Sequence, residues 1–407
     1  MCKKIISIVL VFSLIISNTC IIYADDENEE IDDDTIEVVN QSSDEPALNS
    51  RIAVAYDRKS GNVIWGKNEN KRSAMASTTK IMTAIVLIEN TDLSQTITVS
   101  PKAAGTGGSR LGLKKDDKIT MKDLLYGLML KSGNDAAVAI AENVGGNVEG
   151  FACLMNEKAK ELGLENTHFV TPHGLDDPEH YTTAYELAKL ADYALKNETF
   201  AKVVSTKNYT VTINGYPKAI SNTNELLGYL DGVNGVKTGF TNNAGRCLVT
   251  SVSRNNFDII TVVLQADTKK FRSSDSIKII EYVYENYEQL NIKEIVDDKF
   301  RKWCEINQGR IQINKCKDNN IELYISELKN DIIPVKKVDK DKIDVEINNL
   351  FYFEAPIEKD EIIGSLKVTL NGENVDVVEV KNKQYIRKND VGDYLRIFLW
   401  ELCGEMF

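Results

Sequence analysis

The sequence has 407 residues, 43% hydrophobic and 27% charged, which is the composition of a globular protein with apolar material for one large or two ordinary domains. Its net charge of −12 comes mostly from residues 25–50, which hold eleven acidic residues and no basic ones. The remaining chain is close to neutral and lacks the clustered basic residues of a nucleic-acid-binding protein, so no nucleic acid partner is expected.

The N-terminus has the order of segments that is typical of a secretory signal peptide. Lys3 and Lys4 precede an apolar run over residues 5–16, and Ala24 offers a small residue before a cleavage point. We predict a signal peptide over residues 1–24, and hence an exported, extracytoplasmic protein at the outer face of the cell membrane. An uncleaved membrane anchor is the alternative, although the run is short for a spanning helix. Residues 25–50 are predicted to be a disordered acidic linker.

Strands at both ends of residues 51–290, with helices between them, predict a mixed α/β (α+β) domain. Apolar alternation predicts a hairpin over residues 52–65. Thr183 is expected to cap a helix, with Glu186 completing a capping box. The other predicted elements are helices at 77–90, 121–144 (broken at 132–134), 151–162, 184–196 and 273–288, and strands at 235–238, 247–253 and 258–265.

The pattern changes near residue 291, where short alternating segments predict a small all-β domain over residues 291–387. Its strands are expected at residues 321–325, 343–347, 365–370 and 375–380. Asn371-Gly372 separates the last two and is typical of a tight turn. Residues 388–407 form an apolar tail with polar breaks. This tail is either an amphipathic helix in a membrane interface or a helix packed on the β domain.

Seven cysteines occur, of which Cys2 and Cys20 would leave with the signal peptide. None has metal-ligand spacing, so we expect no metal and treat the others as buried free thiols. Pairing of Cys304 with Cys316 stays open.

Ser77 and Lys80 stand at the start of the helix predicted for residues 77–90. Residues three apart lie on one helix face, so the Lys80 amine can reach the Ser77 hydroxyl. A serine hydroxyl is a weak nucleophile and needs such a base. The helix N-terminus adds partial positive charge beside the reacting group. Alone, this motif is weak.

Two further motifs in a fixed order strengthen the prediction of a serine nucleophile. Ser132-Gly133-Asn134 follows, and Lys237-Thr238-Gly239 comes third, on a predicted strand. Ser132 can relay a proton to a leaving amine, and Asn134 can hold the substrate amide. Lys237 places a cation near the substrate's terminal carboxylate. A glycine on an edge strand allows close approach of a substrate backbone.

With these motifs in place, the sequence resembles the low-molecular-mass penicillin-binding proteins that act as D-Ala-D-Ala carboxypeptidases. The resemblance covers about residues 50–385. It rests on segments 73–83, 108–113, 124–135, 173–176, 181–184, 236–241, 244–245, 355–357 and 363–364.

The resemblance implies a serine β-lactamase/transpeptidase-like catalytic domain, an antiparallel sheet flanked by helices, followed by a small β domain. Ser77 would attack the carbonyl between two D-alanines of a peptidoglycan stem peptide, with Lys80 as general base. Backbone N–H groups of Ser77 and Phe240 would hold the oxyanion, while Lys237, Thr238 and Gly239 bind substrate. No cofactor is implied. β-Lactam antibiotics would acylate the same serine, and a membrane surface is an expected partner.

Two departures from the family pattern concern the region before the third motif. Asn234 stands where the family commonly has Asp, and the segment over residues 222–235 looks shorter than in some relatives. Arg272 is therefore only a candidate substrate contact.

Three other functions fit the motifs less well. A β-lactamase commonly has Ser-Asp-Asn as its second motif and a Glu in the loop where this chain has His173 to Asp176. A binding module is disfavoured by the intact motifs. A zinc peptidase would use His168, His173 and His180, but these lack helical metal spacing and are expected to be surface-loop residues.

Overall fold

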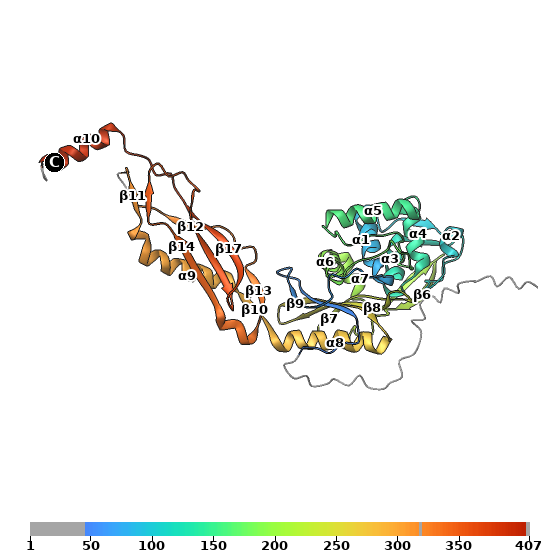
Figure 1. The fold of residues 1–407 in the computed structure, drawn as a ribbon. Helices are drawn as coiled ribbons and strands as arrows, with labels where there is room; N and C mark the ends of the chain where they lie inside the picture. Colours follow the sequence, from blue (N-terminus) through green and yellow to red (C-terminus); the bar gives the residue numbers. More distant parts are fainter. Residues whose placement is uncertain (1–44, 317–319, 404–407) are drawn as a thin grey trace, which may run out of the picture.

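The computed structural model describes residues 45–316 and 320–403 and shows two bodies joined end to end (Figure 1). The first body holds a five-stranded sheet with helices on both faces. The second is built around one long helix and smaller sheets. The predicted signal peptide and most of the predicted linker lie outside the described residues.

The central sheet is antiparallel throughout and has the strand order β2-β1-β9-β8-β7. The hairpin and the three later strands predicted from the sequence are therefore confirmed. β7 stands at one end of this order, so one of its sides has no strand partner in the described part of the chain. The strands are β1 (Ile52–Asp57), β2 (Val63–Lys67), β7 (Val233–Thr241), β8 (Gly245–Arg254) and β9 (Phe257–Ala266).

Both faces of the sheet are covered, because successive side chains of a strand point to opposite faces. Ile52 and Val54 of β1 belong to the main core beneath the helices, whereas Ala53 and Ala55 pack toward α8 (Lys269–Asn286) on the other face. Figure 1 shows α8 alone on its side of the sheet. The helices of the opposite side are α1 (Lys80–Asn90), α2 (Pro101–Ala104), α3 (Met121–Leu130), α4 (Asn134–Val144), α5 (Val148–Glu161), α6 (Ala184–Leu195) and α7 (Glu198–Val204).

The start of α6 shows how local sequence sets a helix boundary. The Thr183 hydroxyl accepts a hydrogen bond from the Glu186 N–H at 3.1 Å, which confirms the predicted N-cap. The predicted capping box is wrong, however. The Glu186 carboxylate instead accepts from the Asn166 N–H and the Thr167 hydroxyl, because a buried loop supplies those donors.

Two small two-stranded sheets on the helical side were not predicted. They are β3 (Thr96–Thr98) with β4 (Lys118–Thr120), and β5 (Asn208–Ile213) with β6 (Tyr216–Ser221).

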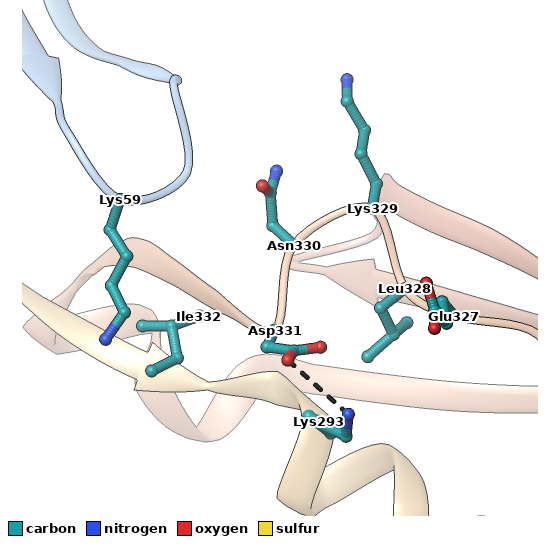
Figure 2. Close-up of a pocket in the computed structure, with 8 residues that line it drawn as sticks. All are labelled: Lys59, Lys293, Glu327, Leu328, Lys329, Asn330, Asp331 and Ile332. Atoms are coloured by element: carbon teal, nitrogen blue, oxygen red, sulfur yellow. Dashed lines mark ion pairs between the residues drawn. The ribbon is translucent and has the colours of Figure 1, made fainter. Parts of the chain in front are cut away.

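The two bodies meet where α8 leads into β10 (Tyr287–Asn291), which pairs with β13 (Ile332–Lys336). The helix predicted to reach residue 288 thus ends two residues earlier. A polar cavity of about 440 Å³ lies at this junction. Figure 2 shows the residues that line it, with Lys59 of the β1–β2 turn on the other side from the loop that leads into β13. An ion pair of 3.6 Å joins Lys293 to Asp331 at its edge.

The second body contains the predicted β-strands and one helix that was not predicted, α9 (Ile292–Asn307). Ile292, Val296, Phe300 and Trp303 recur at helical spacing and face its core, a signal that the strand patterns nearby obscured. The elements that follow are η2 (Gln308–Arg310), β11 (Gln312–Asn314), β12 (Leu323–Ile325), η3 (Lys337–Lys342), β14 (Ile343–Asn349), β15 (Tyr352–Glu354), β16 (Ile362–Leu370) and β17 (Glu373–Asn382).

Four of these strands form a sheet in the order β12-β17-β16-β14, and β11 pairs in parallel with β15. Between β16 and β17, Asn371 and Gly372 both have positive φ, 54° and 86°. Positive φ at both central residues is the signature of a type I′ turn, so the predicted tight turn is confirmed.

The residues just before Arg51, expected to belong to the solvated linker, lie against the first body instead. The backbone N–H and hydroxyl of Ser50 donate to Asp275 on α8 at 2.7 and 2.6 Å. The Lys67 amine donates to the carbonyls of Leu48 and Ser50. The negative charge of the linker obscured this attachment, which also depends on Asp275, a residue 225 positions from Ser50.

The tail forms α10 (Val391–Cys403) at the end of the second body that lies farthest from the first (Figure 1). Asp390 and Asp393 cap its start reciprocally, each accepting from the other's N–H. Its large apolar side chains are exposed, so packing on the β domain, one of the two alternatives for the tail, is wrong. They are Val391, Leu395, Phe398, Leu399, Trp400 and Leu402. No helix within residues 45–316 and 320–403 is long and apolar enough to cross a membrane.

Four described cysteines have free thiols, including Cys304 and Cys316, which do not pair. Cys247 is buried as expected. Cys153 is exposed on α5, which corrects the expectation that all would be buried.

Candidate active site

The first motif lies at a transition between two helix types. Ser77 is in the 3₁₀ helix η1 (Ala76–Thr79), and Lys80 is the first residue of α1. The tighter turn brings the two side chains together, with Lys80 Nζ 2.7 Å from Ser77 Oγ. Ser77 is 5% exposed and Lys80 is fully buried. A buried amine within hydrogen-bond reach of a hydroxyl is the geometry that a general base requires.

Lys80 also binds two groups outside its own helix. Its Nζ donates to Asn134 Oδ1 at 2.7 Å and to the His173 carbonyl at 3.0 Å. The Asn134 amide nitrogen donates in turn to the Gly107 carbonyl at 2.9 Å. Both ends of this amide are therefore engaged. Asn134 holds the lysine in place, a role distinct from the substrate contact that we expected of it.

Ser132 lies in the break between α3 and α4. Its side chain is fully buried, and no described residue makes a hydrogen bond with its hydroxyl. Its φ of 58° is unusual for a residue other than glycine and is characteristic of functional turns. A buried hydroxyl without a partner costs free energy. That cost is expected where the hydroxyl is kept available for a reacting group.

Asp135 fixes the segment that faces this turn. Its carboxylate is fully buried and accepts hydrogen bonds from the backbone N–H groups of Leu111, Gly112 and Leu113 at 2.7–2.9 Å. The Asp135 carboxylate therefore holds residues 111–113 against the start of α4. We did not single out Asp135 from the sequence, since an acidic residue in the first turn of a helix is ordinary.

The third motif lies on edge strand β7, against η1. A Cβ atom built on Gly239 would lie 2.9 Å from the Ser77 nitrogen and 3.1 Å from the Thr78 nitrogen, closer than side chains tolerate. Glycine is therefore required for the strand to approach the nucleophile. Lys237 and Thr238, on the same strand, are both buried. The Thr238 hydroxyl lies 2.8 Å from that of Thr223.

The loop over residues 171–180 forms a further wall of the site. The Thr83 hydroxyl on α1 donates to the Pro172 carbonyl at 2.6 Å. Gly174 has a φ of +85°, and a Cβ there would lie 1.9 Å from the Ala76 carbonyl oxygen. The loop is thus pressed against η1, and this contact presents the His173 carbonyl to the lysine.

Asp176 ties the same loop to the end of β7. It accepts from the Thr241 hydroxyl at 2.6 Å and from the Asn243 N–H at 3.3 Å. The loop therefore spans from the helix that bears the base to the strand that bears the third motif. Asp176 belongs to one of the segments that resemble the family, but the sequence did not predict its hydrogen bonds to Thr241 and Asn243.

The prediction that all three histidines are surface-loop residues is wrong for His180. His180 is 3% exposed rather than on the surface. Its Nδ1 accepts from the Val170 N–H, so its Nε2 carries the proton and donates to the Thr79 hydroxyl at 2.7 Å. Burial lowers the pKa of His180 to about 4. Burial, together with the positive charge of Lys80, lowers the pKa of His173 to about 3. Both rings are therefore neutral at pH 7.

Arg272, the candidate substrate contact, is 1% exposed and forms an ion pair with Glu225 at 2.6 Å. The Ser273 hydroxyl donates to the same carboxylate. The positive charge of Arg272 holds the pKa of Glu225 below its ordinary value against the opposing effect of burial. Arg272 thus contributes to the packing of the loop before β7.

Two family models match the chain. The model of the D-alanyl-D-alanine carboxypeptidase family matches residues 39–268, and the model of the penicillin-binding protein 5 C-terminal domain matches residues 306–388. The chain is 36% identical over 352 residues to D-alanyl-D-alanine carboxypeptidase DacF of Bacillus subtilis, with 84% of this chain and 87% of the relative covered. It is 32% identical over 367 residues to DacA of Haemophilus influenzae, with 86% of each covered.

Solved structures agree in fold. The D-alanyl-D-alanine carboxypeptidase DacD of Francisella tularensis superposes with a TM-score of 0.70 at 27% identity, covering 90% of this chain and all of that one. Penicillin-binding protein 5 of Haemophilus influenzae gives 0.69 at 26% identity, covering 85% and 99%. The Streptomyces K15 DD-transpeptidase gives 0.57 at 35% identity and covers 60% of this chain and 99% of that one. The predicted fold class, with its β-rich C-terminal domain, is confirmed.

Proposed function

The chain belongs to the D-alanyl-D-alanine carboxypeptidase family of serine peptidases, and we propose that it removes the terminal D-alanine of peptidoglycan stem peptides through an acyl-enzyme on Ser77. One observation carries the assignment of the nucleophile. The Lys80 amine lies 2.7 Å from both Ser77 Oγ and Asn134 Oδ1. The first two motifs, 54 residues apart, therefore converge on one atom.

Acylation begins when Lys80 accepts the Ser77 proton and Ser77 Oγ attacks the carbonyl between the two D-alanines. The oxyanion that forms is held by the backbone N–H groups of Ser77 and Phe240. The close approach of Gly239 to the Ser77 nitrogen supports this pairing. Loss of one such donor typically costs ~3 kcal/mol of transition-state stabilisation. Lys237 and Thr238 hold the terminal carboxylate of the substrate.

The intermediate collapses when its C–N bond breaks, and the departing amine needs a proton. Ser132 relays this proton from Lys80 to the amine, for which its buried hydroxyl without a partner is suited. D-Alanine leaves. Water then attacks the acyl carbonyl and gives a proton to Lys80. As the bond between the acyl carbon and Ser77 Oγ breaks, Lys80 returns this proton to Ser77 Oγ, and the shortened peptide leaves. No step uses a metal or a cofactor.

The same nucleophile would open the ring of a β-lactam. The amide carbonyl of the lactam takes the place of the D-Ala-D-Ala carbonyl, so attack by Ser77 gives a penicilloyl ester. Because the leaving amine stays attached to the acyl group, it hinders water, and deacylation is slow. β-Lactam antibiotics are therefore expected to bind as long-lived acyl adducts.

We propose an extracytoplasmic location from the segments at the two ends of the chain. Residues 1–24 direct export, and the acidic linker over residues 25–50 leads into the catalytic domain over residues 51–290. The β domain over residues 291–387 spaces this domain from the tail, residues 388–407. The exposed apolar side chains of α10 support a membrane surface as the partner of this tail, because an apolar helix face of that kind gains free energy in the lipid interface.

Mass spectrometry of the purified protein tests the function directly. We expect a penicilloyl adduct on Ser77 and the loss of one alanine from a peptide ending in D-Ala-D-Ala. Ser77→Ala should show neither, and labelling of that variant would reject the nucleophile. An adduct that disappears within seconds, with the peptide intact, would indicate a β-lactamase. No adduct and no cleavage would indicate a protein that only binds.

A further inference from the structure

Thr79 stands between the nucleophile and the base in the first motif, and the steps proposed above give it no role. Its side chain is fully buried. The Thr79 hydroxyl donates a hydrogen bond to the Ala76 carbonyl at 2.8 Å and lies 2.7 Å from His180 Nε2. Thr79 therefore joins a histidine of the loop over residues 171–180 to the residue immediately before the nucleophile.

The direction of these hydrogen bonds is set by the other ring nitrogen of His180. The Phe169 ring meets the imidazole edge-on, with the ring centres 5.7 Å apart. His180 Nδ1 accepts from the Val170 N–H at 2.9 Å, so the neutral ring has its proton on Nε2 and donates to Thr79. A threonine hydroxyl has a single hydrogen. Since the histidine occupies a lone pair of this hydroxyl, its hydrogen is directed to the Ala76 carbonyl.

The Ala76 carbonyl and the Ser77 N–H belong to one peptide unit. Because a trans peptide unit is planar, its C=O and N–H point in opposite directions, and a group that holds one also directs the other. A Cβ atom on Gly174 would lie 1.9 Å from the Ala76 oxygen. A Cβ atom on Gly239 would lie 2.9 Å from the Ser77 nitrogen. The carbonyl side of the unit thus faces the loop over residues 171–180, and the nitrogen side faces β7.

The backbone of Ala76 needs such a restraint. Its φ of 48° lies in the left-handed region, which residues with a Cβ adopt only at a cost in free energy. A change in the backbone angles of Ala76 would turn the peptide unit that follows and would move the Ser77 N–H out of line with the oxyanion. The hydrogen bond from Thr79 to the Ala76 carbonyl opposes this change.

We propose that Thr79 and His180 are positioning residues, which direct the Ser77 N–H to the oxyanion by holding the carbonyl of the same peptide unit. His180 donates to Thr79, Thr79 donates to Ala76, and no proton is transferred between them. Because a preorganised donor acts where charge develops, the effect appears in the rate of bond formation and leaves ground-state binding unchanged. This inference rests on the proposed function, since that reaction makes the Ser77 N–H an oxyanion donor.

Stopped-flow acylation by a fluorescent penicillin separates binding from bond formation. Thr79→Val removes the hydroxyl and keeps the branched shape of the side chain. We expect its acylation rate constant to fall by about 10- to 100-fold at an unchanged dissociation constant, a smaller loss than the ~10²–10³-fold cost of removing an oxyanion donor outright. Thr79→Ser keeps the hydroxyl and should acylate within about threefold of wild type.

The infrared stretch of the acyl-enzyme carbonyl reports the same geometry. A hydrogen bond to this carbonyl weakens its C=O bond and lowers its stretching frequency. We expect Thr79→Val to shift the band to higher frequency, whereas Thr79→Ser should keep the wild-type band. A loss of stability alone would leave the band in place. A wild-type acylation rate constant and an unshifted band in Thr79→Val would overturn the inference.

Thr167→Val is the matched control. The Thr167 hydroxyl is also buried between two partners, since it donates to Glu186 at 2.6 Å and lies 2.7 Å from the Thr182 hydroxyl. These partners lie at the N-terminal end of α6, outside η1. The variant should lower the melting temperature and keep the wild-type acylation rate constant and carbonyl band. If it slowed acylation as much as Thr79→Val, the cause would be a general loosening of the fold, and the inference would fail.

Two substitutions of His180 test the same relay if Thr79→Val does not fold. A glutamine amide can reach the position of Nε2 and donate to Thr79, whereas an asparagine side chain reaches only the position of Nδ1, where it can accept from Val170. We expect His180→Gln to acylate about tenfold faster than His180→Asn, the value of one hydrogen bond expressed in the transition state. Equal rates in the two variants would reject the relay.

Nuclear magnetic resonance separates this inference from the proposed reaction. The chain has three histidines, so His180→Gln identifies the imidazole resonances of His180. Their nitrogen chemical shifts should show a neutral ring with its proton on Nε2 in the free enzyme. If wild type had this tautomer but neither reacted with penicillin nor cleaved the peptide, the proposed function would fail and the hydrogen-bond relay would stand. A proton on Nδ1 would reject the relay, whatever the cleavage result.

Discussion

Replacing Asn134 by alanine tests whether the position of the Lys80 amine controls acylation. The change removes one of the acceptors around a fully buried Lys80 and leaves the Gly107 carbonyl without its amide donor. A hydrogen bond to a charged group contributes ~1.5–3 kcal/mol. If the loss is expressed in the transition state, acylation slows by roughly 10- to 150-fold.

The assay is the second-order rate of Ser77 acylation by a fluorescent penicillin in stopped flow. Asn143→Ala is the control, because Asn143 lies on the same helix and its amide only donates to the Ala139 carbonyl within that helix. It should acylate at the wild-type rate. If Asn134→Ala kept its melting temperature and acylated within about twofold of wild type, Asn134 would not position the base, and the reasoning from this geometry would be refuted.

Four other changes have defined outcomes. Ser132→Ala should barely change the melting temperature, since no described residue binds the hydroxyl, but should slow peptide turnover ~10²-fold or more, and normal turnover would exclude a proton relay. Gly174→Ala should lower both the melting temperature and the acylation rate, because its Cβ would overlap the Ala76 carbonyl; an unaffected enzyme would mean that this loop is not pressed on η1. Burial lowers the pKa of His180 from 6.5 to about 4, so the unfolded chain binds the proton more tightly than the folded one. The contribution of neutral His180 to the free energy of unfolding is therefore fully present above pH 6.5 and is lost as the pH falls toward 4. His180→Gln should flatten that part of the denaturation profile, and an unchanged slope would assign it to other groups. Deleting residues 391–403 should release the protein from anionic and neutral lipid vesicles in flotation, whereas unchanged flotation would reject the tail as an anchor.

Local patterns were enough to predict much of the catalytic body. Alternating residues specified the hairpin over residues 52–65, and Thr183 marked a helix start, because both signals act over a few residues. Asn371-Gly372 specified its turn for the same reason. The helix α9 was missed because the segments that follow it alternate like strands. The three-residue strands β3 and β4 are too short to show an alternating pattern.

Partners far apart in the chain were beyond these local patterns. The Ser50–Asp275 contact joins residues 225 apart, and the Thr241–Asp176 contact joins residues 65 apart. The acidic composition near Ser50 pointed to a solvated linker, but a buried carboxylate that needed donors held that residue in place. Surface position was likewise assumed for His180, which the fold buries.

The sequence by itself determined which groups could do the chemistry, because a serine, a lysine and two later motifs in fixed order carry that information in their identities and local spacing. Only the tertiary structure decided what surrounds Lys80. The acceptors Asn134 and His173 come from segments that are separate in the sequence. The His173 acceptor is a backbone carbonyl, which every residue type has, so the sequence could not predict it. The Ser132 hydroxyl, which no described residue binds, is of the same kind, because whether a buried hydroxyl has a partner depends on which groups packing brings near it.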